Sequence, residues 1–117
     1  MPGIVDMHLE VIREFEKFRK NYTEYVKVIK KLADEHFGNL YGVFVFGSVL
    51  KKTSRPLSDI DVAVVLFTPA EEEERIGFYR KIREVFGFSH PFEIHIVSKG
   101  EWDSWYRRFI KDCMRVY

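Results

Sequence analysis

The sequence has little of several features that would narrow its class by themselves. One cysteine, Cys113, among 117 residues excludes an intramolecular disulfide and a thiolate-bound metal cluster. With 19 basic and 18 acidic residues the net charge is only +1, so bulk charge predicts neither a nucleic-acid binder nor a membrane-surface binder. The apolar stretches at 41–46 and 60–67 are too short to span a bilayer, and no signal-peptide layout opens the chain. We therefore expect a soluble cytoplasmic protein.

Apolar residues, in contrast, are abundant. They make up 46% of the chain, and eleven of them are Phe. This composition is enough to build a core without disulfides or a structural metal, and it excludes a disordered chain. The length predicts one domain over residues 1–117.

Helical periodicity runs from about residue 6 to 36, where Gly38-Asn39 stops it; the unusual length makes a break near Asn21 conceivable. Short β-branched and aromatic runs predict strands at 41–46, 60–67 and 92–97.

Two further helices are predicted between and after these strands. For the first, Thr68 is expected to be the N-cap and Pro69 the first helical residue, with Ile76, Tyr79, Ile82, Val85 and Phe86 on the apolar side and Gly87 at the end. A capping box at 98–101 opens the second, an aromatic helix over about 99–115, in which Cys113 is expected to be core or partly buried.

The order of elements predicts a small α/β (α+β) domain. We expect a central mixed sheet of three or four strands flanked by helices, with a motif-bearing core over about 41–97. The aromatic stripe of the last helix is interpreted as core, with a protein interface as the alternative; it comprises Trp102, Trp105, Tyr106 and Phe109.

The first candidate site lies where the strand at 41–46 ends. Gly47-Ser48 can present free N–H groups and a hydroxyl to a phosphate, although alone it is an ordinary turn. In the next strand, Asp59 and Asp61 lie two residues apart and so project from the same face. Paired carboxylates repel unless a cation such as Mg²⁺ lies between them, but an isolated Asp-x-Asp is more often a solvated turn.

A third acidic residue occurs in the strand at 92–97. Alternation places Glu93 and His95 on one face and the apolar residues on the other. If this strand pairs beside the Asp strand, Glu93 can hold a metal or accept a proton from an attacking hydroxyl. His95 is a possible ligand, although a polar residue on a half-exposed strand is the more common interpretation.

The run 47–64 resembles the signature of the DNA polymerase beta-like nucleotidyltransferase superfamily, Gly-Ser followed about ten residues later by Asp-x-Asp. The short chain is similar to the minimal nucleotidyltransferase domain proteins of archaea and bacteria. This resemblance implies Mg²⁺, as two ions, on Asp59, Asp61 and Glu93. It also implies ATP as substrate, with its phosphates held by Gly47, Ser48, Lys51, Lys52 and Ser58.

The implied reaction is in-line attack by a hydroxyl on the α-phosphate of a nucleoside triphosphate, with release of pyrophosphate. One departure from the family signature weakens the case for this reaction. Val49-Leu50 follows Gly-Ser where many members carry an arginine, which leaves Lys51, Lys52 or Arg55 as the basic residues nearby.

Three functions follow from the resemblance. The leading one is an AMP transferase that acts as the antitoxin of an HEPN-domain protein. The alternative is a non-catalytic module that neutralises its partner by contact. A nucleic-acid nucleotidyltransferase is disfavoured because no extended basic stripe is visible. A homo-oligomer is left open.

Overall fold

The structure is a computed structural model, and it describes residues 4–47, 50, 59–106, 108 and 112–117. Four of the residues expected to bind phosphate lie outside this range: Ser48, Lys51, Lys52 and Ser58.

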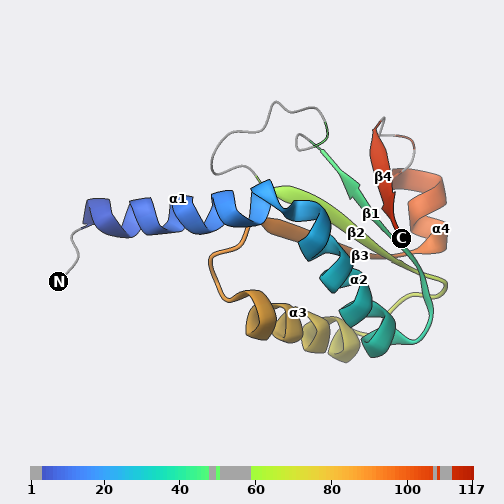
Figure 1. Cartoon of the computed structure of the whole chain (residues 1–117). Coiled ribbons are helices and arrows are strands. Elements are labelled where there is room, and N and C mark those ends of the chain that lie inside the picture. The colour runs from blue at the N-terminus through green and yellow to red at the C-terminus, as the bar shows by residue number, and fades with distance from the viewer. Residues whose placement is uncertain (1–3, 48–49, 51–58, 107, 109–111) are drawn as a thin grey trace.

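The centre of the fold is a four-stranded mixed sheet (Figure 1). Its strands are β1 (Leu40–Phe46), β2 (Ile60–Leu66), β3 (Phe92–Ser98) and β4 (Cys113–Val116), in the order β3-β2-β1-β4. Strands β2 and β3 are parallel, whereas β1 runs antiparallel to both β2 and β4. The predicted class, a small mixed sheet flanked by helices, is confirmed.

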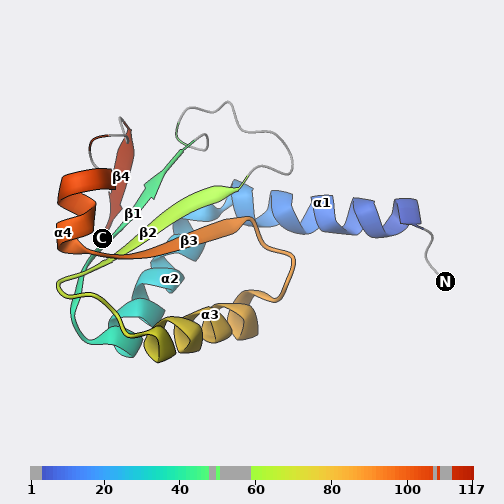
Figure 2. The same ribbon diagram turned by 180° about the vertical axis from the view of Figure 1, so that it is seen from behind.

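Among the described residues, four α-helices accompany the sheet: α1 (Ile4–Lys20), α2 (Tyr22–Phe37), α3 (Glu72–Phe86) and the short α4 (Lys99–Glu101). A π-helical turn, Trp102–Tyr106, continues directly from α4. Helices α2 and α3 lie together on one side of the sheet, and α1 extends away from the sheet (Figures 1 and 2). No helix in the described part of the chain combines the length and hydropathy that crossing a bilayer requires.

The predicted N-terminal helix is two helices, with the break at Asn21. This residue has φ −116° and ψ 31°, which lies outside the helical region. Gly38 then ends α2 in the left-handed conformation, with φ 73°, and its N–H donates to the carbonyl of Asp34. Both signals read from the sequence, the break and the glycine stop, are confirmed.

The two faces of the sheet are covered differently. Beneath α2 and α3 lies the main core, where Val26, Ile29, Val64 and Phe78 are fully inaccessible to solvent. The opposite face, termed here the open face, carries a smaller cluster of Phe44, Ala63, Val65, Val97 and Trp102. Trp102 is only 3% exposed, so the core interpretation of this aromatic residue is correct.

The predicted start of α3 is wrong. The N-cap is Glu71 rather than Thr68, and it forms a capping box with Glu74. The Thr68 hydroxyl is engaged elsewhere, because it accepts a hydrogen bond of 2.8 Å from the Asn39 side-chain amide. That contact ties the end of β2 to the start of β1 and leaves Pro69 in the connecting turn.

The predicted apolar side of α3 is also partly wrong. Phe78 and Ile82 are buried, whereas Ile76 and Val85 are about half exposed. The helix packs against α2, and a narrow stripe of it joins the main core through Phe78 and Ile82, which one helical turn separates.

The C-terminal helix does not reach residue 115 as predicted. Residues 113–116 form β4, in which Val116 is buried against the main core and Cys113 is exposed. Pairing with β4 satisfies the backbone groups along the free edge of β1, which a helix could not do. The predicted capping box at its start is half formed: the Ser98 Oγ accepts from the Glu101 N–H, while the Glu101 carboxylate accepts from the Ser98 hydroxyl.

Candidate active site

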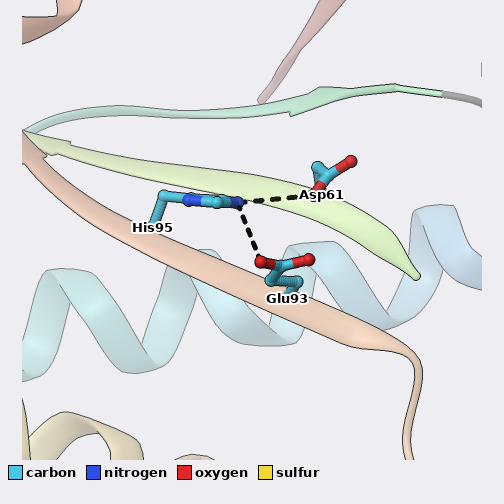
Figure 3. Close-up of side chains that lie close together, drawn as sticks. All are labelled: Asp61, Glu93 and His95. Carbon is cyan, nitrogen blue, oxygen red and sulfur yellow. Dashed lines mark hydrogen bonds and ion pairs between the residues drawn. The ribbon is translucent and has the colours of Figure 1, made fainter.

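The pairing of β2 with β3 brings three polar side chains together on the open face (Figure 3). In the parallel register Asp61 lies opposite Glu93, and His95 lies opposite Ala63. Because strand residues two apart share a face, His95 projects from the same side as Glu93. Figure 3 shows the three side chains pointing toward one another from the two strands. The predicted alternation of Glu93 and His95 is confirmed.

The distances within this cluster are short. The Nε2 atom of His95 lies 3.3 Å from Asp61 Oδ1 and 3.9 Å from Glu93 Oε1. One ligand atom from each residue lies within 4.8 Å of the others. The Glu93 side chain is 54% exposed, whereas those of Asp61 and His95 are about a quarter exposed, so the cluster opens to solvent on the Glu93 side.

The surroundings of Glu93 disfavour its ionised form. Its pKa is raised, first by partial desolvation and then by the negative charge of Asp61, with further contributions from the charge and a hydrogen bond of Asp59. The pKa of His95 is raised as well, chiefly by its hydrogen bond to Asp61. Both shifts have the sign expected when carboxylates crowd together and a cation is favoured among them.

Gly47 contacts this cluster from β1. It has φ 94°, and a Cβ built on it would lie 2.5 Å from Asp61 Oδ2. Only glycine allows both this backbone conformation and this approach. Gly47 and Asp61, separate in sequence, are therefore adjacent in space.

Two aromatic rings orient the histidine. The imidazole of His95 packs against Phe46 at 5.5 Å and against Tyr106 at 6.1 Å, measured between ring centroids. Phe46 ends β1 and pairs with Asp61, while Tyr106 comes from the π-helical turn. Neither aromatic could be placed at the site from the sequence, because strand pairing positions Phe46 there and the π-helical turn positions Tyr106.

The structure brings together some of the predicted site residues and not others. Asp61 and Glu93 meet as predicted, and Gly47 adjoins them. Asp59 is exposed and falls outside the set of three residues whose ligand atoms lie within 4.8 Å of one another, although its charge acts on Glu93. His95, treated as the less favoured ligand, belongs to that set.

The donor set fits a divalent cation. An octahedral ion with ligands at about 2.1 Å keeps neighbouring donor atoms about 3 Å apart and opposite ones about 4 Å apart. The distances of 3.3 and 3.9 Å fall in this range. Two carboxylates and an imidazole leave further positions for water and substrate phosphates.

Residues 26–112, about three quarters of the chain, match the family model described as Polymerase beta, Nucleotidyltransferase. The chain therefore belongs to this family of nucleotidyltransferases, as the Gly47-to-Asp61 run implied. A solved structure of a candidate nucleotidyltransferase is similar over 80% of this chain and 98% of its own, with 34% identity and a TM-score of 0.64. A second, from Sulfolobus solfataricus, shares the fold at 19% identity and a TM-score of 0.58, covering 87% of this chain and 85% of its own.

A relative with a stated reaction is spectinomycin 9-adenylyltransferase from Enterococcus faecalis. It is 32% identical over 66 residues, which are 56% of this chain and 26% of that protein. A crystal structure of spectinomycin adenyltransferase with ATP and spectinomycin is similar over 72% of this chain, with 30% identity and a TM-score of 0.56, but over only 36% of its own. This chain therefore spans about a quarter to a third of the length of that relative.

Proposed function

We propose that this chain transfers a nucleoside monophosphate, AMP from ATP, to a hydroxyl acceptor in a reaction that needs a divalent cation. The observation that carries the proposal is the meeting of Asp61, Glu93 and His95 within 4.8 Å beside Gly47. Membership of the nucleotidyltransferase family and similarity to an adenylyltransferase support it.

In this proposal Asp61 and Glu93 hold Mg²⁺, and Asp59, near Glu93, extends the acidic set toward a second ion. When bound, the metal neutralises phosphate charge and favours the ionised form of the acceptor hydroxyl. The Glu93 carboxylate oxygen that the ion leaves free would receive the acceptor's proton. The acceptor oxygen bonds to the α-phosphorus, the bond to the bridging oxygen breaks, and pyrophosphate leaves.

In this proposal the segment that follows β1 binds the phosphates of the nucleotide. Gly47 and Ser48 would hold the phosphates, assisted by Lys51, Lys52 and Ser58. Leu50 follows the position where many members of the superfamily carry an arginine, and it is partly buried against the main core. Its apolar character therefore has a packing role, and the basic function passes to the lysines that follow.

We further propose that the acceptor is on a partner protein, an HEPN-domain protein for which this chain is the antitoxin, in the cytoplasm where ATP is available. The resemblance implies this pairing. The solvent-facing side of the cluster, where Glu93 is 54% exposed, supports an acceptor that arrives from outside the domain.

The second candidate function is a module that neutralises its partner by binding alone. The observation that favours it is Val49-Leu50 in place of the basic pattern. In that case the chain would keep the arrangement of Asp61 and Glu93 but would not catalyse nucleotide transfer.

Label transfer separates these functions. The full chain is incubated with Mg²⁺, the neighbour-encoded HEPN protein and ATP labelled at the α-phosphate or at the γ-phosphate. The proposal requires partner labelling from the α-label alone, and loss of labelling with Asp61→Asn but not with Asp34→Asn, which changes an exposed carboxylate on α2. A stable complex without label supports the binding module and refutes catalysis.

A further inference from the structure

We propose that His95 is itself a ligand of the divalent ion, through Nε2, and that the site consequently binds Mn²⁺ or Co²⁺ in preference to Mg²⁺. This inference rests on the metal site of the proposed function; it adds a third ligand to that site and ranks the divalent ions that the site binds, Mg²⁺ among them. It assigns a metal-binding role to a residue outside the Asp-x-Asp motif.

The position of the imidazole is that of a ligand. Nε2 is the ring nitrogen that faces the carboxylates, at 3.3 Å from Asp61 and 3.9 Å from Glu93. Among the described residues these three, and not Asp59, make up the set whose ligand atoms lie within 4.8 Å of one another. An ion that binds Asp61 and Glu93 together is therefore placed within reach of Nε2.

The ring is held in this position by its surroundings. Phe46 and Tyr106 contact it from β1 and from the π-helical turn, at centroid distances of 5.5 and 6.1 Å. Its cross-strand neighbour Ala63 carries only a methyl group, so nothing bulky on β2 separates the imidazole from Asp61. A ligand fixed in advance loses little conformational entropy when the ion binds.

The nitrogen donor decides which ion is favoured. Mg²⁺ is a hard ion that takes oxygen ligands and retains several waters. Imidazole binds more strongly to the first-row transition ions, and affinity rises from Mn²⁺ to Co²⁺. Replacing one oxygen ligand by His95 Nε2 therefore shifts the preference of the site away from Mg²⁺. The two carboxylates still bind the ion, which can also bind substrate phosphates.

Pulsed electron paramagnetic resonance tests the ligand directly, without turnover. Mn²⁺ is added to the full chain, and coupling between the ion and an imidazole ¹⁴N nucleus is recorded. We expect this coupling in the wild type and in His36→Gln, whose histidine lies between α2 and α3, but not in His95→Gln. Wild-type chain labelled with ¹⁵N-histidine should replace the ¹⁴N signal by a ¹⁵N signal, a control that needs no substitution.

Calorimetric titration gives the preference. His95→Gln should weaken Co²⁺ binding by at least about tenfold and Mg²⁺ binding by less than about threefold. Bound Mn²⁺ without nitrogen coupling, or equal losses for both ions, would overturn the inference and leave His95 as a residue that only orients Asp61; the metal-dependent function would survive. Absence of any divalent binding to the wild type, with or without ATP, would overturn that function as well.

Discussion

The two faces of the sheet are made from the same strands, but one face carries the apolar core and the other carries the cluster of polar side chains. On the covered face, Val62 and Val64 of β2 are inaccessible to solvent and pack beneath α2 and α3. On the open face the same strand presents Asp61, which meets Glu93 and His95 of β3. Stability is concentrated on the first face and ligand chemistry on the second, so substitutions on the two faces should have separable effects.

The largest expected effect is on the covered face. Phe78→Ala removes a fully buried ring from the main core and should lower the free energy of unfolding by about 3–5 kcal/mol. Phe88→Ala, on a ring that is 83% exposed, should change it by less than about 0.5 kcal/mol. Urea unfolding followed by circular dichroism measures both, and equal losses would contradict the assignment of the core.

On the open face, Asp61→Asn should affect activity rather than stability. Loss of a charged metal ligand should reduce transfer of the α-phosphate label by about 100- to 1,000-fold. The unfolding free energy should change by less than about 1 kcal/mol, because the paired groups are partly solvated. If Asp61→Asn destabilised the chain as strongly as Phe78→Ala, the separation of the two faces would fail.

Gly47→Ala tests how β1 reaches the open face. An alanine at this position would have to adopt φ 94°, and its methyl group would displace Asp61 Oδ2, so the free energy of unfolding should fall by about 1–3 kcal/mol. Because Asp61 is displaced, divalent-ion binding should weaken as well. Gly100→Ala is the matched control, since its Cβ would meet only Ser98 Oγ at 3.9 Å. Thermal unfolding and metal titration of both variants decide the point; a harmless Gly47→Ala would refute the close approach.

The smallest expected effect is the pH dependence of the metal-free chain. The folded-state pKa of His95 lies above the ordinary value of 6.5, so its stabilising contribution is fully present below pH 6.5 and is lost as pH rises through the folded value. The raised pKa of Glu93 acts in the same direction, since its ionised form is disfavoured in the fold. Both effects should together be less than about 1 kcal/mol.

Chemical denaturation with EDTA at pH 5.5 and 8.5 measures this small effect. The stability advantage of wild type over His95→Gln should shrink at the higher pH. An advantage that is equal at both pH values would mean that the His95–Asp61 contact is not charged.

The sequence predicted the two faces to different extents. The uninterrupted apolar run of β2 and the alternation of β3 are local patterns, so both strands and the shared face of Glu93 and His95 could be predicted. The contact of Gly47 with Asp61 depends on the pairing of β1 with β2, which no local pattern encodes. The positions of Phe46 and Tyr106 beside His95 also depend on contacts between segments distant in sequence, so they could not be predicted either.

The C-terminal segment shows where helical spacing misleads. Helical spacing of the aromatic residues continues to Cys113, yet residues 113–116 form β4 because the edge of β1 needs a partner. Sheet pairing, a long-range requirement, overrides local helix preference there. The start of α3 was mispredicted for a related reason, since Thr68 bonds to Asn39, which is distant in sequence.

A crystal structure of the chain with Mn²⁺ and a non-hydrolysable ATP analogue tests the central claim most directly. The account predicts an anomalous-scattering peak between the carboxylates of Asp61 and Glu93 on the open face, with the analogue's phosphates adjoining it near Gly47. An analogue bound elsewhere, or no Mn²⁺ peak at these carboxylates, would contradict it.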